Sequence, residues 1–256
     1  MKFGVCGGPD IGQIAKSCGY DYFEWSVGGL LNPREEEEVF ESALEQAKAV
    51  GLPCPAVNVF IPGDLKIVGP DVPRSALEGY VTTALRRAEI AGVERVVFGS
   101  GGARRIPDDF DRERAWQQLI EFCRMVGAIA QDHGVLIAIE PLNLTETNVI
   151  NTVAEGAKLA RDVNHPNIRL LVDGYHWAKD NDTTEGIIEN ADLLVHAHVA
   201  TLDGRRPPRD GDTTEGFFQV LKKAGYDGRV SIEGRIDNPQ EELPRALEIM
   251  KKAVNS

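Results

Sequence analysis

The sequence has little of what marks a secreted or membrane-bound protein. Its four cysteines show no CxxC or CxxH spacing, and a chain of this length does not need disulfides to stabilise its core. No apolar run approaches the roughly 18 residues that a membrane helix requires, and the first residues lack the apolar segment of a signal peptide. We therefore expect reduced thiols, a soluble cytoplasmic protein and no membrane partner.

Positive charge is also scarce. The 256 residues include 28 Lys and Arg against 40 Asp and Glu, which gives a net charge of −12, and no basic stripe stands out. Phosphate backbones are bound by clustered Lys and Arg, so nucleic acid is not expected as a partner.

Apolar runs of four to eight residues alternate with longer amphipathic segments, a pattern typical of repeated strand–helix units. The chain length is close to that of an eight-unit barrel. We predict an α/β protein consisting of one (β/α)8 TIM barrel domain over residues 1–256. The expected strands are 2–6, 21–27, 55–61, 94–100, 135–142, 168–173, 192–199 and 228–234.

The clearest helix is predicted from Arg112 to His133, where apolar residues recur every three or four positions and Gly134 follows as a C-terminal signal. The acidic run 35–38 predicts the first turn of another helix, with Asn32 as its N-cap. Longer loops at 63–74 and 201–212 could cover a site.

Four polar side chains end buried runs that read VLIAIE, IRLLVD, LLVHAH and RVSIE. They are Glu140, Asp173, His198 and Glu233, spaced by 33, 25 and 35 residues. Each spacing is about one strand–helix unit, which predicts that the four lie at the same end of successive parallel strands, where barrels carry their active sites. A buried carboxylate or imidazole is costly unless it is paired or bound to a metal.

Three carboxylates cannot lie close together in a dry pocket without a cation. Carboxylate oxygens with a single imidazole suit Mn²⁺ best among the divalent ions, with Mg²⁺ or Co²⁺ also possible. These four residues therefore predict a divalent metal cofactor.

Four segments resemble the signature blocks of the xylose isomerase-like TIM barrels, above all the branch of sugar isomerases and ketose 3-epimerases. They read IEPLNLTETNVINT (139–152), LLVDGYH (170–176), HAHVATLDGRRPP (196–208) and GYDGRVSIEG (225–234). The resemblance implies that Glu140, Asp173, His198 and Glu233 bind the metal. It also implies that Glu140 and Glu233 act as acid and base on opposite faces of the substrate.

The same resemblance implies substrate contacts for Glu146, His176 and Arg205. The match at Arg205 needs a one-residue insertion, so Arg206 is an alternative. Leu144 stands where the branch commonly has an arginine, which departs from the epimerase type of sugar contact.

Other candidates remain open. His196 shares a strand face with His198 and is either a further site residue or a packed imidazole. Glu24 ends another apolar run and either binds substrate or forms a structural ion pair. Arg104 and Arg105 follow a glycine-rich string that is either an anion cradle or an ordinary strand–helix turn.

The leading hypothesis is a divalent-metal-dependent isomerase or 3-epimerase that acts on a ketose or keto-sugar through a metal-stabilised enediolate. The alternative is a lyase or dehydratase that applies the same enolate chemistry to an oxidised sugar or 3-oxo-glycoside.

Abasic-site endonucleases share the barrel but resemble a trinuclear zinc design rich in histidine, whereas this chain has five histidines. A non-catalytic binding role is a further alternative, and related barrels lead us to expect a homo-oligomer, a dimer or tetramer.

Overall fold

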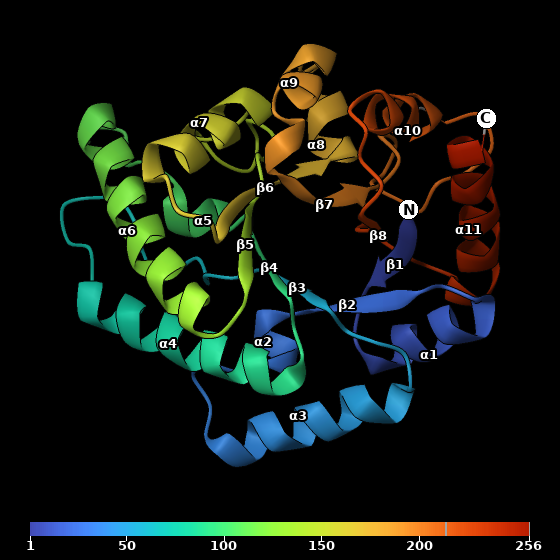
Figure 1. Cartoon of the computed structure of the whole chain (residues 1–256), viewed down its shortest axis with the longest axis horizontal. Coiled ribbons are helices and arrows are strands. Elements are labelled where there is room, and N and C mark those ends of the chain that lie inside the picture. The colour runs from blue at the N-terminus through green and yellow to red at the C-terminus, as the bar shows by residue number, and fades with distance from the viewer. Residues whose placement is uncertain (213, 256) are drawn as a thin grey trace.

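Eight parallel strands close into a barrel in the computed structural model, which describes residues 1–212 and 214–255 (Figure 1). Consecutive strands are neighbours, and the eighth pairs with the first. Each strand lies inside one predicted range, which confirms the predicted (β/α)8 barrel. The strands are β1 (Lys2–Cys6), β2 (Tyr22–Ser26), β3 (Ala56–Asn58), β4 (Arg95–Phe98), β5 (Leu136–Ile139), β6 (Ile168–Asp173), β7 (Leu194–Val199) and β8 (Arg229–Ile232).

Helices form a layer outside the strands (Figure 1). Their apolar faces pack against the barrel in one large hydrophobic core. None of those described combines the length and apolar character needed to cross a bilayer. The helices are α1 (Pro9–Cys18), α2 (Val27–Leu30), α3 (Glu37–Val50), α4 (Arg74–Ala91), α5 (Gly101–Arg104), α6 (Arg112–Asp132), α7 (Val153–Val163), α8 (Gly174–Lys179), α9 (Thr184–Glu189), the 3₁₀ helix η1 (Ala191–Leu193), α10 (Thr214–Lys223) and α11 (Pro239–Asn255).

Helix α6 has the predicted extent to within one residue. The Asp111 side chain caps its first turn by accepting a hydrogen bond of 2.7 Å from the Arg114 amide. Gly134, two residues beyond its end, adopts a positive φ of 66°, so the chain turns there with little steric cost.

The predicted N-cap at Asn32 is wrong, because α3 begins only at Glu37. Arg87 of α4 is 3% exposed and donates hydrogen bonds to the carbonyl oxygens of Asn32 and Glu35 and to the carboxylate of Glu37. These carbonyls are bound by a side chain from another helix, and Asn32 has a left-handed φ of 45°. The segment before Glu37 is therefore held outside the helix.

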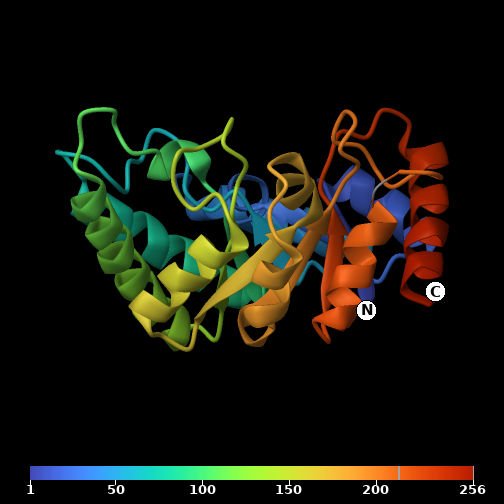
Figure 2. The ribbon, with the colours of Figure 1, turned by 90° about the horizontal axis from the view of Figure 1, so that it is seen from above.

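The longer loops project from one side of the barrel, where the strands have their C-terminal ends (Figure 2). The non-glycine residues with positive φ on this side include Val59 at 55°, Ser100 at 46°, Ile150 at 58° and Arg205 at 49°. Such a backbone costs about 1–3 kcal/mol per residue and occurs most often around functional sites. This side of the barrel therefore carries the candidate site.

Gly4 in β1 leaves room for the ring of Tyr22 inside the barrel. A Cβ at Gly4 would lie 2.2 Å from Tyr22 Cε2, and Tyr22 is 1% exposed. We predict that Gly4→Ala lowers the free energy of unfolding by about 1–3 kcal/mol, as overpacking does, measured by urea denaturation.

The control for this prediction is Gly79→Ala. Gly79 is exposed in the middle of α4, with no atom within 4 Å of an added Cβ, so alanine should raise stability by up to about 1 kcal/mol. A Gly4→Ala protein as stable as wild type would contradict the close packing around Tyr22.

Candidate active site

The four strand-end residues converge at the C-terminal mouth of the barrel. Glu140 follows β5, Asp173 ends β6, His198 lies in β7 and Glu233 follows β8. His198 Nδ1 lies 3.4 Å from Glu140 Oε1 and 3.5 Å from Glu233 Oε2. Carboxylate oxygens of Glu140, Asp173 and Glu233 lie within 4.8 Å of one another, together with a ring nitrogen of His176. The structure thus brings all four into one centre, with His176 beside them.

Burial and charge act differently on the three carboxylates. Burial raises the pKa of Asp173 to about 6. It also raises the pKa of Glu140, and the nearby Glu233 adds to that shift. Burial acts in the same direction on Glu233, but His198 and Arg205 outweigh it and hold the pKa of Glu233 at about 2. The centre therefore concentrates negative charge where water cannot screen it.

Several buried polar atoms in and around the centre have no hydrogen-bond partner among the described residues. Two of them are His198 Nδ1 and Glu140 Oε1, which lie 3.4 Å apart. Unpaired buried polar atoms are rare in proteins, and a bound ion is one of their explanations. Carboxylates with one imidazole are also a suitable donor set for an oxygen-preferring divalent ion. The residues present therefore fit a divalent cation.

Arg205 reaches into this centre from the loop after β7. Its Nη2 atom lies 2.5 Å from Glu233 Oε2 and 3.3 Å from both Asp173 Oδ2 and His176 Nε2. The carbonyl oxygen of Arg205 would be 2.3 Å from a Cβ at Gly234, so glycine is needed there for the loop to approach. Arg206 instead pairs with Asp237, at 2.5 Å. The structure therefore places Arg205 in the centre and Arg206 outside it.

His176 and Glu146 lie beside Arg205 and share a partner in Asn143. His176 Nδ1 accepts hydrogen bonds from the backbone N–H of Asn143 at 3.2 Å and from its side-chain Nδ2 at 2.7 Å. Burial lowers the pKa of His176, so the ring is neutral and its Nε2 carries the hydrogen, 3.5 Å from Asp173 Oδ2. Glu146 accepts from Asn143 at 2.9 Å and lies 3.4 Å from Arg205.

Two neighbours of the centre were not predicted. Asn58 ends β3 and donates to Glu233 Oε1 at 2.9 Å. It follows an apolar run just as the four predicted residues do. Its position was therefore an available signal, although its side chain is neutral. The ring of Tyr175 lies 4.8 Å from the guanidinium carbon of Arg205. Its position two residues after Asp173, in the first turn of α8, was the available signal.

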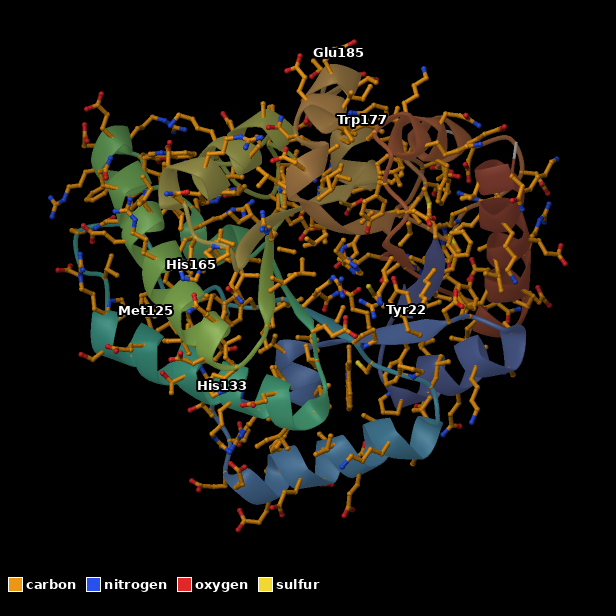
Figure 3. The ribbon with its side chains drawn as sticks, viewed as in Figure 1. Tyr22, Met125, His133, His165, Trp177 and Glu185 are labelled. Carbon is orange, nitrogen blue, oxygen red and sulfur yellow. The ribbon has the colours of Figure 1, made fainter. Side chains whose placement is uncertain are left out.

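The open alternatives for Glu24 and His196 are resolved by their burial. Both side chains have 0% exposure, and His196 Nε2 lies 2.8 Å from Glu24 Oε2. Glu24 is therefore hydrogen-bonded inside the barrel and does not line the mouth, and His196 is a packed imidazole. His133 and His165 lie in the outer helical layer, away from the centre (Figure 3).

Arg104 is not part of an anion cradle. It has 0% exposure and donates to the carbonyl oxygens of Phe98, Glu140 and Ile150 at 3.1, 2.8 and 3.3 Å. Burial lowers the pKa of Arg104 to about 10. Arg105 is exposed. The glycine-rich string is thus a strand–helix turn, and Arg104 positions the backbone of Glu140.

A closed parallel barrel with a carboxylate-rich centre at its C-terminal mouth defines an α/β-barrel enzyme with its site in the usual place. Residues 13–253 match the xylose isomerase-like TIM barrel family. The chain belongs to this family, which confirms the resemblance seen in the sequence.

Relatives of this chain include sugar epimerases and isomerases. A D-psicose 3-epimerase from Ruminiclostridium cellulolyticum is 30% identical over 124 residues, which are 48% of this chain and 42% of that protein. A 3-dehydro-D-guloside 4-epimerase from Escherichia coli K12 is 27% identical over 239 residues, covering 88% of this chain and 86% of that protein. These relatives confirm the expected enzyme class, a sugar isomerase or epimerase.

The fold is shared with solved structures of such enzymes. The structure of D-psicose 3-epimerase with D-tagatose, from Clostridium cellulolyticum H10, has a TM-score of 0.85 and covers 99% of both chains. Its sequence is 20% identical to this one, so the likeness concerns the fold alone.

Proposed function

We propose that this enzyme is a divalent-metal-dependent epimerase or isomerase of a keto-sugar, which moves a proton next to a carbonyl group through an enediolate. The observation that carries the proposal is the pair of glutamates from β5 and β8. Each has a carboxylate oxygen close to His198 Nδ1, at 3.4 Å for Glu140 and 3.5 Å for Glu233. By the resemblance to the epimerases, one of the two would lie on each face of a keto-sugar bound in the mouth.

Two opposed carboxylates suit this reaction. Glu233 would remove the proton from the carbon next to the carbonyl, and Glu140 would return one on the other face, which inverts that carbon. If one carboxylate moved the proton between neighbouring carbons, the result would be isomerisation. Asn58 donates to Glu233 Oε1 at 2.9 Å and so holds one oxygen of that group while the other faces the centre.

The residues that would hold the cation are Glu140, Asp173, His198 and Glu233, with Mn²⁺ preferred over Mg²⁺ or Co²⁺. When bound, it would stabilise negative charge on the carbonyl and neighbouring hydroxyl oxygens.

Three further residues would bind and orient the sugar. His176 offers its Nε2 hydrogen, Arg205 its guanidinium donors, and Glu146 an acceptor oxygen whose side chain is 38% exposed. Hydrogen bonds of this kind hold a sugar ring or chain so that one C–H bond faces the base.

The names of the relatives support a keto-sugar substrate. A D-psicose 3-epimerase and a 3-dehydro-D-guloside 4-epimerase both invert a carbon next to a carbonyl. A 3-dehydro-glycoside is a second candidate substrate, because the match to the 4-epimerase spans 86% of that protein. The exposed Leu144, at 65%, also stands where ketose epimerases commonly have an arginine. These relatives do not favour the lyase or dehydratase alternative.

The test is a panel of D-fructose, D-psicose, D-tagatose and 3-oxo-glycosides incubated in D₂O and followed by NMR. We predict that an epimer or isomer forms with deuterium at the carbon next to the carbonyl. Glu140→Gln and Glu233→Gln should each slow the reaction by about 10²- to 10⁴-fold, the usual contribution of a general acid or base.

The matched control is Glu185→Gln, an exposed carboxylate on α9 (Figure 3), which should keep wild-type activity. Detection of an unsaturated elimination product would reject the epimerase proposal in favour of the lyase alternative. No reaction with any ketose or 3-oxo-glycoside would reject the proposal.

Metal dependence is a separate prediction. Dialysis against a chelator should abolish activity, and added Mn²⁺ should restore it. Mn²⁺ at 100 times its dissociation constant should stabilise the protein by about 2.7 kcal/mol, seen as a rise in the melting temperature. Asp173→Asn should lose this rise, because it removes a charge from the centre, whereas Glu146→Gln should keep it. Full activity in protein shown to be metal-free by mass spectrometry would contradict the prediction.

Arg205 and Arg206 form a natural pair for comparison. Arg205→Ala should lower kcat/KM by about 10- to 100-fold, the equivalent of one charge-assisted hydrogen bond. Arg206→Ala should change it less than about threefold, because Arg206 pairs with Asp237 outside the centre. Equal effects of the two substitutions, measured by steady-state kinetics, would reject the assignment of Arg205.

A further inference from the structure

Beneath the carboxylate centre lies a second polar group that the proposed reaction does not use. Glu24 of β2 accepts hydrogen bonds from three side chains. His198 Nε2 lies 2.9 Å from Glu24 Oε1, while His196 Nε2 and Ser231 Oγ lie 2.8 and 2.6 Å from Glu24 Oε2. A carboxylate only accepts, so both imidazoles donate through Nε2.

This group is closed to substrate. Glu24, His196 and Ser231 all have 0% exposure. The Tyr22 hydroxyl lies 2.9 Å from Ser231 Oγ, so the hydrogen-bonded chain continues away from Glu24 to Tyr22, inside the ring of strands (Figure 3). Glu24 can therefore influence the reaction only through the side chains that it contacts.

His198 joins the two groups. The neutral imidazole, which is the form that binds a metal ion, has one nitrogen that donates and one that accepts. Because Nε2 donates to Glu24, the lone pair of that form is on Nδ1, the atom that lies 3.4 and 3.5 Å from Glu140 and Glu233. The contact with Glu24 thus decides which nitrogen, in which orientation, faces the centre.

We propose that Glu24 is a positioning residue of the metal centre, which fixes the tautomer and ring orientation of His198 so that Nδ1 is presented to a divalent cation. Ser231, supported by Tyr22, holds the Glu24 carboxylate in place. This inference rests on the proposed metal dependence. Carboxylates in such a position commonly raise metal affinity 10- to 100-fold.

The alternative is a purely structural role, in which Glu24 only compensates the burial of two histidines. The two roles differ in a measurable way. A structural role predicts loss of stability with unchanged metal affinity, whereas a positioning role predicts weaker metal binding by protein that is still folded.

The test measures the dissociation constant of Mn²⁺ alone with chelator-treated full-length protein, by EPR of free Mn²⁺, together with the melting temperature of the metal-free protein. Glu24→Gln is isosteric but has a single acceptor oxygen, so it cannot accept from both histidines. We expect it to weaken Mn²⁺ binding by at least about tenfold. The matched control is Glu37→Gln, which removes a carboxylate bound to Arg86 and Arg87 in the helical layer. It should lower the melting temperature and leave the affinity unchanged.

The outcomes separate this inference from the proposed function. No Mn²⁺ binding by wild type would overturn the metal centre and the inference with it. Wild-type binding together with unchanged affinity in folded Glu24→Gln would overturn the inference alone. If Glu24→Gln does not fold, Ser231→Ala replaces it, because loss of the 2.6 Å hydrogen bond frees the carboxylate to turn. We then expect affinity to fall by about threefold or more, and unchanged affinity would again overturn the inference.

Discussion

The structure depends on the confinement of negative charge at the mouth of the barrel. Glu140, Asp173 and Glu233 end three strands within a few ångströms of one another, and a fold that buries them must also supply positive partners. His198 Nδ1 lies close to Glu140 and Glu233, and the loop after β7 carries Arg205 to Asp173 and Glu233. The placement of that loop, the glycine at 234 and the polar layer beneath the centre all follow from this electrostatic requirement.

Much of the fold and part of the candidate site could be predicted from the sequence, because both depend on local patterns. Apolar runs of strand length located every strand, and the polar residues at the ends of these runs included Glu140 and Glu233, which the fold brings into one centre. The start of α3 could not be predicted in this way. It depends on Arg87, whose guanidinium binds carbonyl oxygens some 50 residues earlier in the chain.

Side-chain direction and strand register explain why other features of the site could not be predicted from the sequence. Glu24 ends an apolar run just as Glu140 does, yet it lies beneath the centre, hydrogen-bonded to His196 and His198 from β7. Sequence periodicity alone does not say whether a strand-end carboxylate faces the mouth or the interior, since that depends on the stagger of the closed sheet. Asn58 was missed for a different reason, because a neutral amide gives no electrostatic signal although it binds Glu233.

The left-handed backbone at Val59 and Ile150 has a consequence for how the mouth of the barrel is built. Both side chains are β-branched, and such residues adopt this conformation only where the surrounding structure imposes it. The loops after β3 and β5 therefore owe their shape at these two positions to the packing around them and not to the preferences of their own residues.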